Sequence, residues 1–490
     1  MTRAHRNQNA KYACTYVTCE FITWPAGRHD YISGAHTVKP SIARITVEKL
    51  FGRYSYEISS DDMLKDGTVA EGRLILLYGE NGSGKTTILS LVYHLLSSAR
   101  KKGHRTFIAR TEFQRFAILL TDGTSVEAVR PKGATKGTYI VKIGRKNRAS
   151  QRFPMEIDSE GKVDPDDLEH NQLVVALSEI GVSPYYLSED RTFLSDSLLE
   201  EDDEYANIRF DEMRKYRHHL LRSSRVNSLD NVEAASRTAR QSKELLVAIS
   251  RAERWLQLQA FRSTSAGMAN ANTVYADVLR HLLTASNPAD AERGDNKTPV
   301  MERLNALAAR SNEYAKFDLG TRFPARQFIE LLRQAPSDRR GLLESALVPH
   351  IESSETQLDA SKSIYELLTT FTTAINDLFV DKEISFSASS DGITISTVGA
   401  DRQPIYPTSL SSGERQLLLL LTNTLIAREN SGLFIIDEPE ISLNVMWQRE
   451  LLDVLLRCTS GTGVQFLVAT HSIEMLSSHR PSMIRLAMNA

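Results

Sequence analysis

The feature that most constrains the fold is the segment Gly79-Glu80-Asn81-Gly82-Ser83-Gly84-Lys85-Thr86, which matches the pattern G-x-x-x-x-G-K-[ST] over its whole length. An apolar run of strand length, residues 74–78, comes directly before it, and a helical pattern, residues 87–96, follows it. Glycines let the backbone N–H groups of such a loop turn toward phosphate oxygens, and the helix start adds its positive dipole end. The segment therefore predicts an α/β fold that binds a nucleotide.

The residue types in this loop also assign parts of the site. Lys85 is expected to reach the β- and γ-phosphates, and the Thr86 hydroxyl is expected to ligate Mg²⁺. The predicted cofactors are therefore ATP and Mg²⁺. The residues expected to bind ATP from this side are Gly79, Asn81, Gly82, Ser83, Gly84, Lys85, Thr86 and Thr87.

A pair of acids follows a predicted buried strand far along the chain. Residues 433–436 are apolar, and Asp437 and Glu438 come directly after them. Open α/β sheets bind ligands at the carboxyl edge of their strands, where this pair would lie. Asp437 is the candidate to hold Mg²⁺, and Glu438 is the candidate to polarise the attacking water. An apolar run that ends in two acids is common by itself, and the phosphate loop in the same chain makes it informative.

Two more segments have both a structural and a functional interpretation. In Leu410-Ser411-Ser412-Gly413-Glu414-Arg415-Gln416, the first serine and the glutamate could simply cap a helix. His471 follows a predicted strand at 464–469, where a single histidine is usually structural. Here, however, the histidine lies at the sheet edge that presents residues to a nucleotide.

Together and in this order, the four motifs resemble Walker A, the signature, Walker B and the switch histidine of an ABC-type ATPase head. The Leu-Ser-Ser-Gly-Glu signature, the segment Pro439-Glu440-Ile441-Ser442-Leu443-Asn444 and residues 50–56 narrow the resemblance to Rad50/RecF/OLD-like heads, the AAA-15 or AAA-21 class. The resemblance covers residues 42–200 and 384–490. It implies an ABC-type P-loop NTPase head, with a mixed sheet that has helices on both faces, an antiparallel β subdomain and a mostly helical insertion.

The same resemblance implies a site shared between two subunits. Ser411 and Gly413 would contact the γ-phosphate bound to the phosphate loop of a second subunit, so that two heads close on two ATP molecules. Ser442 and Asn444 would form the D-loop across this seam. The implied assembly is a homodimer or a higher homo-oligomer.

The resemblance also assigns the chemistry, which is hydrolysis of ATP to ADP and phosphate. His471 would steady the γ-phosphate or the attacking water, so that Glu438, His471 and Lys85 are the predicted catalytic residues. Thr86 and Asp437 are the predicted metal ligands. Residues 186–191 are a candidate Q-loop, with an ordinary strand end as the alternative.

The pattern along the chain predicts four parts. These are an N-terminal extension without an assignment (1–41), a first ATPase lobe (42–200), a helical insertion that forms a short arm or binds a partner (201–383), and a second ATPase lobe (384–490). In the first lobe a strand begins at Ile42 and its alternation continues to Tyr56, and a hairpin is predicted over 115–129. Buried helix faces in the insertion are predicted from Leu245, Ile249, Ala252 and Leu256, from Val274, Val278, Leu279 and Leu282, from Phe328, Leu331 and Leu332, and from Tyr365, Leu368, Phe371 and Ile375.

The insertion distinguishes branches of the family. Periodic stretches of about 40 residues give helices of about 60 Å, whereas Rad50 and SMC proteins insert hundreds of residues, and the Cys-x-x-Cys hook of Rad50 is missing. The chain ends soon after His471, so the Toprim nuclease domain of OLD nucleases is not expected. The chain therefore resembles stand-alone ATPase subunits of anti-phage defence systems, PARIS-like or Septu-like.

Functions of different classes remain open. One is a sensor or scaffold that controls a separate effector in anti-phage defence, either a Toprim or HNH nuclease or a toxin. Another is a RecF/Rad50-like DNA-repair ATPase that clamps DNA, and a third is a translation-associated or other ABC ATPase. Basic stretches at 100–102, 145–148 and 214–225 are expected to be solvated faces, and they would bind DNA without sequence preference if they converge on one surface in a dimer.

Composition narrows the environment. Lys and Arg number 59 against 61 Asp and Glu, a formal charge of −2, which excludes a globally polybasic nucleic-acid coat. Three cysteines are too few for a disulfide scaffold. No apolar run approaches the length that spans a bilayer, and no secretory signal is recognisable. These features predict a cytoplasmic protein without a membrane partner.

Overall fold

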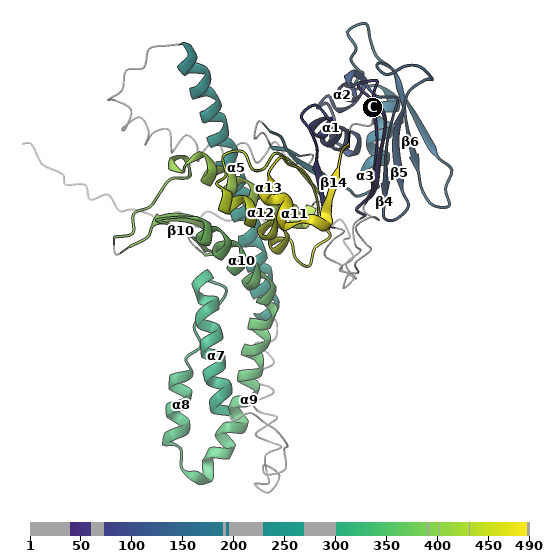
Figure 1. Ribbon diagram of the computed structural model, residues 1–490. Coiled ribbons are helices and arrows are strands. Elements are labelled where there is room, and N and C mark those ends of the chain that lie inside the picture. Colours follow the sequence, from purple (N-terminus) through teal and green to yellow (C-terminus); the bar gives the residue numbers. More distant parts are fainter. Residues whose placement is uncertain are drawn as a thin grey trace, which may run out of the picture. The chain divides into compact units, whose positions relative to one another are not determined.

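The computed structural model describes residues 40–59, 73–189, 193–195, 229–268, 300–389, 392–399, 401–430 and 432–487 (Figure 1). The predicted helix face from Val274 to Leu282 and the basic stretch 214–225 lie outside these residues, as does nearly all of the N-terminal extension. In the described part of the chain, no helix carries an apolar stretch that could cross a bilayer.

A mostly parallel six-stranded sheet carries the strands that precede the motifs. Its order is β14-β3-β13-β12-β8-β9, and only β9 runs antiparallel to its neighbour. The strands are β3 (Leu74–Tyr78), β8 (Pro184–Leu187), β9 (Phe193–Ser195), β12 (Leu433–Asp437), β13 (Gln465–Ala469) and β14 (Met483–Arg485). The central strands are continuous apolar runs, as expected for strands covered on both faces. The strands predicted before the phosphate loop, the acid pair and the histidine are confirmed.

An antiparallel six-stranded sheet forms the predicted β subdomain. Its order is β2-β1-β4-β5-β6-β7. The strands are β1 (Ile42–Leu50), β2 (Tyr54–Ser59), β4 (Arg115–Leu120), β5 (Ser125–Val129), β6 (Tyr139–Gly144) and β7 (Gln151–Met155). The hairpin over 115–129 is confirmed. The continuous alternation from Ile42 to Tyr56 is wrong, because Phe51 (φ 53°) and Gly52 (φ 73°) form a left-handed turn and β2 folds back onto β1.

The parallel sheet separates two hydrophobic cores, because successive side chains of a strand point to opposite faces. Leu74 and Leu76 belong to one core, whereas Ile75 and Leu77 belong to the other. On the second face, α1 (Lys85–Leu96) packs against β8, β12 and β13 of the parallel sheet and against β5 of the antiparallel sheet. The helices α2 (His104–Arg110) and α3 (Leu168–Ser178) pack against α1 and β7 respectively.

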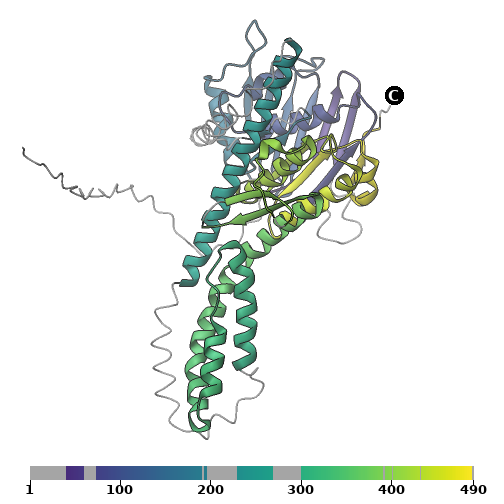
Figure 2. The same ribbon diagram turned by 90° about the vertical axis from the view of Figure 1, so that its left-hand side faces the viewer.

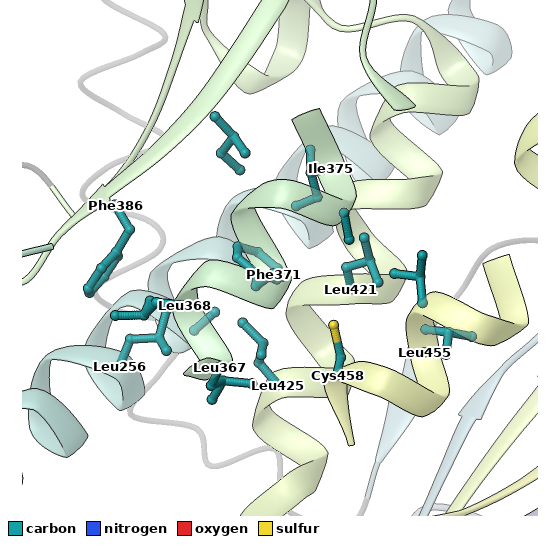
Figure 3. Packing of buried hydrophobic residues seen from close by; sticks show 14 of the residues in the cluster. Leu256, Leu367, Leu368, Phe371, Ile375, Phe386, Leu421, Leu425, Leu455 and Cys458 are labelled. Carbon is teal, nitrogen blue, oxygen red and sulfur yellow. The ribbon is translucent and has the colours of Figure 1, made fainter. Parts of the chain in front are cut away.

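The first core lies under four helices, α5 (Leu229–Met268), α10 (Lys362–Leu378), α11 (Ser412–Asn430) and α12 (Val445–Cys458). Figure 3 shows Phe371 and Ile375 of α10 gathered with Leu421 of α11 and Leu455 of α12. The α10 face predicted from the sequence is confirmed for Leu368, Phe371 and Ile375, each 0% exposed, and Tyr365 is partly buried. This packing fixes α11 and α12, and so the segments at their N-terminal ends.

The described part of the insertion is helical. It contains α5, α7 (Val300–Tyr314), α8 (Ala325–Gln334), α9 (Ser337–Ala360) and α10, with a short 3₁₀ turn at Ala315–Phe317, and α7, α8 and α9 pack side by side (Figures 1 and 2). The α5 face from Leu245 to Leu256 is buried as predicted. The prediction for α8 is wrong at Leu331, which is 59% exposed, because it lies about 100° around the helix from buried Leu332.

The C-terminal region completes the head with a hairpin and short elements. The hairpin pairs β10 (Lys382–Ser387) with β11 (Gly392–Thr397). The remaining elements are α13 (Ile473–Ser478) and the 3₁₀ turns Pro407–Ser409 and Arg480–Ser482.

Candidate active site

The phosphate-binding loop joins β3 to α1, as its sequence predicts. Gly84 precedes the helix with φ 92°, a conformation that favours glycine, and a Cβ there would lie 2.6 Å from the Leu50 Cδ2 atom. A Cβ on Gly79 would lie 2.9 Å from the Leu486 carbonyl oxygen. Asn81, Gly82 and Thr86 are exposed, while Ser83 is buried. Close packing therefore requires both glycines, and the backbone conformation requires glycine at position 84 as well.

Lys85 is held inside the loop. Its residue is 6% exposed, and the Nζ atom donates to the carbonyl oxygens of Gly79 (3.0 Å) and Glu80 (3.2 Å). Burial lowers the pKa of Lys85, and the nearby carboxylates of Glu438, Asp437 and Glu440 oppose this shift. The ammonium therefore lies close to the acid pair at the end of β12.

Thr86 and Asp437 lie together, although 350 residues separate them in the chain. The Thr86 side chain lies close enough to lower the pKa of the Asp437 carboxyl, and Asp437 is 2% exposed. Burial raises the pKa of Asp437 to about 6, and the charges of Glu438 and Glu189 add to the increase. The Oδ1 atom of Asp437 is buried and, within the described residues, has no hydrogen-bond partner. A hydroxyl and an unsatisfied carboxylate oxygen are a donor set that suits Mg²⁺.

Glu438 and His471 face each other at the carboxyl edge of the sheet. The Nε2 atom of His471 lies 3.6 Å from Oε1 of Glu438, and both side chains are partly exposed, 38% and 24%. Glu438 has φ 49°, and its N–H donates to the Ala469 carbonyl at 2.9 Å. A left-handed non-glycine residue is costly and such residues are common at functional sites. The fold thus brings the predicted base and the switch histidine into one pair.

The signature segment begins α11 and makes local contacts. The N–H of Ser411 donates to Oε2 of Glu414 (2.7 Å), and the Glu414 N–H donates to the Ser411 hydroxyl (3.3 Å). This is the reciprocal capping box that the structural interpretation predicts. Ser411 is exposed, and the carboxylate of Glu414 also binds Lys382 at 2.7 Å.

Gly413 and the predicted D-loop contact each other within the chain. A Cβ on Gly413 would lie 2.5 Å from the Ser442 carbonyl oxygen, so only glycine fits there. Ser442 itself has φ 68°. Asn444 caps α12, where its Oδ1 atom accepts from the Trp447 N–H at 2.9 Å. The contacts of Ser411 and Gly413 are therefore with their own helix and with this turn.

The candidate Q-loop is described up to Glu189. The Tyr186 hydroxyl lies 3.5 Å from Oδ2 of Asp437 and 3.1 Å from the Ser90 hydroxyl of α1. Burial raises the pKa of Tyr186, and the charge of Asp437 raises it further. The end of β8 therefore lies beside the acid pair, and the assignment of a Q-loop stays a prediction.

Sequence reasoning missed the part that Glu440 and Gln448 play in this region. Oε1 of Glu440 accepts from the His471 and Ser472 N–H groups, and Oε1 of Gln448 accepts from the Ser472 hydroxyl. The signal available in the sequence was a third acid two residues after Glu438. These contacts join segments that no periodicity relates.

One of the predicted basic stretches contributes to the lining of an open groove of about 400 Å³. Arg100 lines it, and Arg145 pairs at 2.9 Å with Glu179, which also lines it. Lys101 is paired with Asp166 at 3.0 Å. Part of this positive charge is therefore neutralised within the chain.

Comparisons with known proteins identify the family. The family model AAA_21, described as "AAA domain, putative AbiEii toxin, Type IV TA system", matches residues 74–477. The chain belongs to this family, and it is an ABC-type ATPase head. No curated protein matches the sequence.

Solved structures that align with the chain include Smc head domains. One, an Smc head with an extended coiled coil bound to the C-terminal domain of ScpA from Pyrococcus furiosus, aligns with 11% identity and a TM-score of 0.35, covering 90% of this chain and 92% of that chain. Another, an Smc head with a coiled coil and joint from Pyrococcus yayanosii, aligns with 14% identity and a TM-score of 0.35, covering 90% and 94%.

Proposed function

We propose that this member of the AAA_21 family binds Mg²⁺-ATP and hydrolyses it to ADP and phosphate. One observation carries the proposal: the buried carboxylate of Asp437 lies beside Thr86 and keeps one oxygen without a partner among the described residues. Leaving such an oxygen unsatisfied is costly unless a ligand uses it. Its position beside Lys85 suits the metal of a bound nucleotide.

The residues of one chain supply most of the reaction. Lys85 would leave the Gly79 and Glu80 carbonyl groups and donate to the phosphates. Thr86 and Asp437 would hold Mg²⁺, which neutralises phosphate charge when bound. Glu438 would accept a proton from the attacking water, and His471, 3.6 Å from Glu438, would orient that water or the γ-phosphate.

The remaining groups would come from a second copy. Ser411 is exposed at the start of a 19-residue helix, where the N–H groups and the dipole favour an anion. We infer that this helix start and Gly413 contact the γ-phosphate held by the loop of the other copy. Hydrolysis would then require two heads that close on two ATP molecules.

At the level of the cell, we propose a sensor or scaffold that assembles with ATP and controls a separate nuclease or toxin in anti-phage defence. The family description names a putative toxin and a toxin–antitoxin system, which supports a role beside a toxic effector. The alternative is a DNA-clamping repair ATPase. It draws support from Arg100 in the groove, although the nearby Arg145 is already paired with Glu179.

The activity is tested with Lys85→Ala. The wild-type protein should bind ATP, turn it over and become larger by light scattering with Mg²⁺-ATP. The variant should lose binding and turnover, because the charge that complements the β- and γ-phosphates is gone. Turnover at the wild-type rate in Lys85→Ala would show that the site is assigned wrongly.

The biological role needs a separate experiment. Co-purification with the products of neighbouring genes, with and without ATP, should recover an effector in a nucleotide-dependent complex. DNA binding that is strong at about 50 mM salt and falls steeply by about 300 mM would favour the DNA-clamping alternative. Recovery of neither an effector nor DNA would contradict both roles.

A further inference from the structure

Glu440 ties two segments of the candidate site together. Its Oε1 atom accepts hydrogen bonds from the N–H groups of His471 (2.6 Å) and Ser472 (3.0 Å). The other oxygen, Oε2, is buried and has no hydrogen-bond partner in the described part of the chain. Bonds from an N–H to a carboxylate are stronger than those between neutral groups. The turn that carries His471 is therefore anchored by the acid that lies two residues after Glu438.

A second tie runs through Gln448 of α12. The Ser472 hydroxyl donates to its Oε1 atom (2.7 Å), and its Nε2 atom donates to the Leu443 carbonyl (2.9 Å). The same Ser472 hydroxyl caps α13 by accepting from the Met475 N–H at 3.2 Å. The turn around Ser442 and the turn around His471 are thus held to one another by Glu440 on one side and Gln448 on the other.

The imidazole of His471 depends on this backbone anchor. Its side chain is 38% exposed, and its interaction with Glu438 is 3.6 Å long. A side chain that is not packed takes its position from the backbone beneath it. Loss of the two N–H bonds would free that backbone and let the Nε2 atom move away from Glu438.

We propose that Glu440 is a positioning residue of the ATPase site, which holds the His471 turn so that the imidazole faces Glu438. The inference rests on the proposed ATPase function and deepens it. It assigns to the third acid a role that is distinct from holding the metal or accepting a proton.

The kinetic test uses Glu440→Ala, Glu440→Asp and Glu440→Gln. The alanine variant and the shortened aspartate variant should lower kcat by about 10- to 100-fold, while KM for ATP changes by less than about 3-fold. The glutamine variant should restore most of kcat, because its Oε1 atom can accept the same two N–H bonds without a charge. If Glu440→Gln is as slow as Glu440→Ala, or if KM rises instead of kcat falling, the proposal is overturned.

A double substitution tests whether Glu440 acts through the histidine. In a His471→Ala background, Glu440→Asp should lower kcat by less than about 2-fold, because the group being positioned is already absent. Independent, multiplicative losses would contradict the proposal. Glu474→Gln is the matched control. Glu474 belongs to the adjacent helix α13 and pairs with Arg449 of α12, so this substitution should leave turnover unchanged.

Amide hydrogen exchange separates this inference from the proposed function. The His471 and Ser472 amides should exchange faster in Glu440→Asp and Glu440→Ala, and at the wild-type rate in Glu440→Gln and Glu474→Gln. Unchanged exchange in the first two variants would overturn the tie even if the wild type hydrolyses ATP. A wild type that exchanges as expected but has no turnover would overturn the proposed function alone.

Discussion

The two halves of the candidate site differ in how completely one chain builds them. In the phosphate half, Lys85 and Thr86 lie beside the distant residue Asp437, and one buried oxygen of its carboxylate has no partner among the described residues. In the signature half, Ser411 and Glu414 satisfy each other within one helical turn, and Ser411 is exposed.

This difference indicates which further component, a ligand or a second copy of the chain, each half of the site needs. An unpartnered buried carboxylate oxygen is unfavourable, so the phosphate half is suited to a ligand. A capped helix start is stable without further partners, so the signature half can remain exposed to solvent until a second copy binds. One chain should therefore bind ATP, and hydrolysis should depend on assembly.

The largest effect is expected from Glu438→Gln in the phosphate half. Glutamine keeps the shape of the side chain but loses the carboxylate that polarises water, so turnover should fall by about 10²–10⁴-fold. Binding through Lys85, Thr86 and Asp437 should persist, and the assembled state should accumulate in light scattering with Mg²⁺-ATP. Normal turnover would remove Glu438 from its assigned role.

The next effect is expected from Ser411→Arg in the signature half. Bulk and charge at the exposed helix start should keep heads from closing, so turnover should fall by about 10- to 100-fold while ATP binding in one chain is unchanged. Ser411→Ala controls for the lost cap, because it removes the hydroxyl without adding bulk. If Ser411→Arg assembles and turns over ATP normally, the site is complete within one chain and the comparison fails.

The same contrast explains what the sequence could predict. The phosphate loop, the acid pair and the capping box are local, since a strand, a glycine turn or a capped helix is decided by neighbouring residues. Their identification needed no tertiary information. By contrast, the bonds from Tyr186 to Asp437 and from His471 to Glu440 depend on strand order and on turn geometry. No spacing in the sequence specifies which of the distant segments become neighbours.

A smaller effect on stability is expected from Asp437→Asn, and it should have opposite signs without and with Mg²⁺-ATP. Burial raises the pKa of Asp437 from 3.8 to about 6, so the folded state disfavours the ionised form and stability falls as pH rises through 6. Without Mg²⁺ and above about pH 7, removal of this charge should raise Tm. The corresponding gain in the free energy of unfolding should be at most about 3 kcal/mol. With Mg²⁺-ATP the order should reverse, because only the wild type is stabilised by binding.

Thermal melts in EDTA from about pH 3.5 to pH 8 check this prediction, since the advantage of Asp437→Asn should shrink as pH falls below about 6 and vanish only near the unfolded pKa of about 4. A variant that is less stable than the wild type at every pH would mean that Asp437 is satisfied without a ligand. That result would erase the difference between the two halves.

The smallest effect is expected from Glu414→Ala in the signature half, and it should be one of stability. Burial opposes ionisation of Glu414, but hydrogen bonds from Lys382 and Ser411 outweigh it and lower its pKa. Its contribution is therefore present at neutral pH and lost as pH falls through the folded pKa. Glu414→Ala should cost about 1–2 kcal/mol at neutral pH, the usual value of a helix cap.

The signature half needs only an intact helix start, so Glu414→Ala should keep ATP binding and most of the turnover below its lowered Tm. Glu383→Ala is the matched control, because Glu383 makes a more exposed pair with Arg402 at 3.0 Å and should shift Tm by less. A Glu414→Ala protein with normal Tm but no turnover would place this carboxylate in the reaction itself. Since Glu414 is 6% exposed and its described partners are Lys382 and Ser411, we expect the loss to appear in Tm.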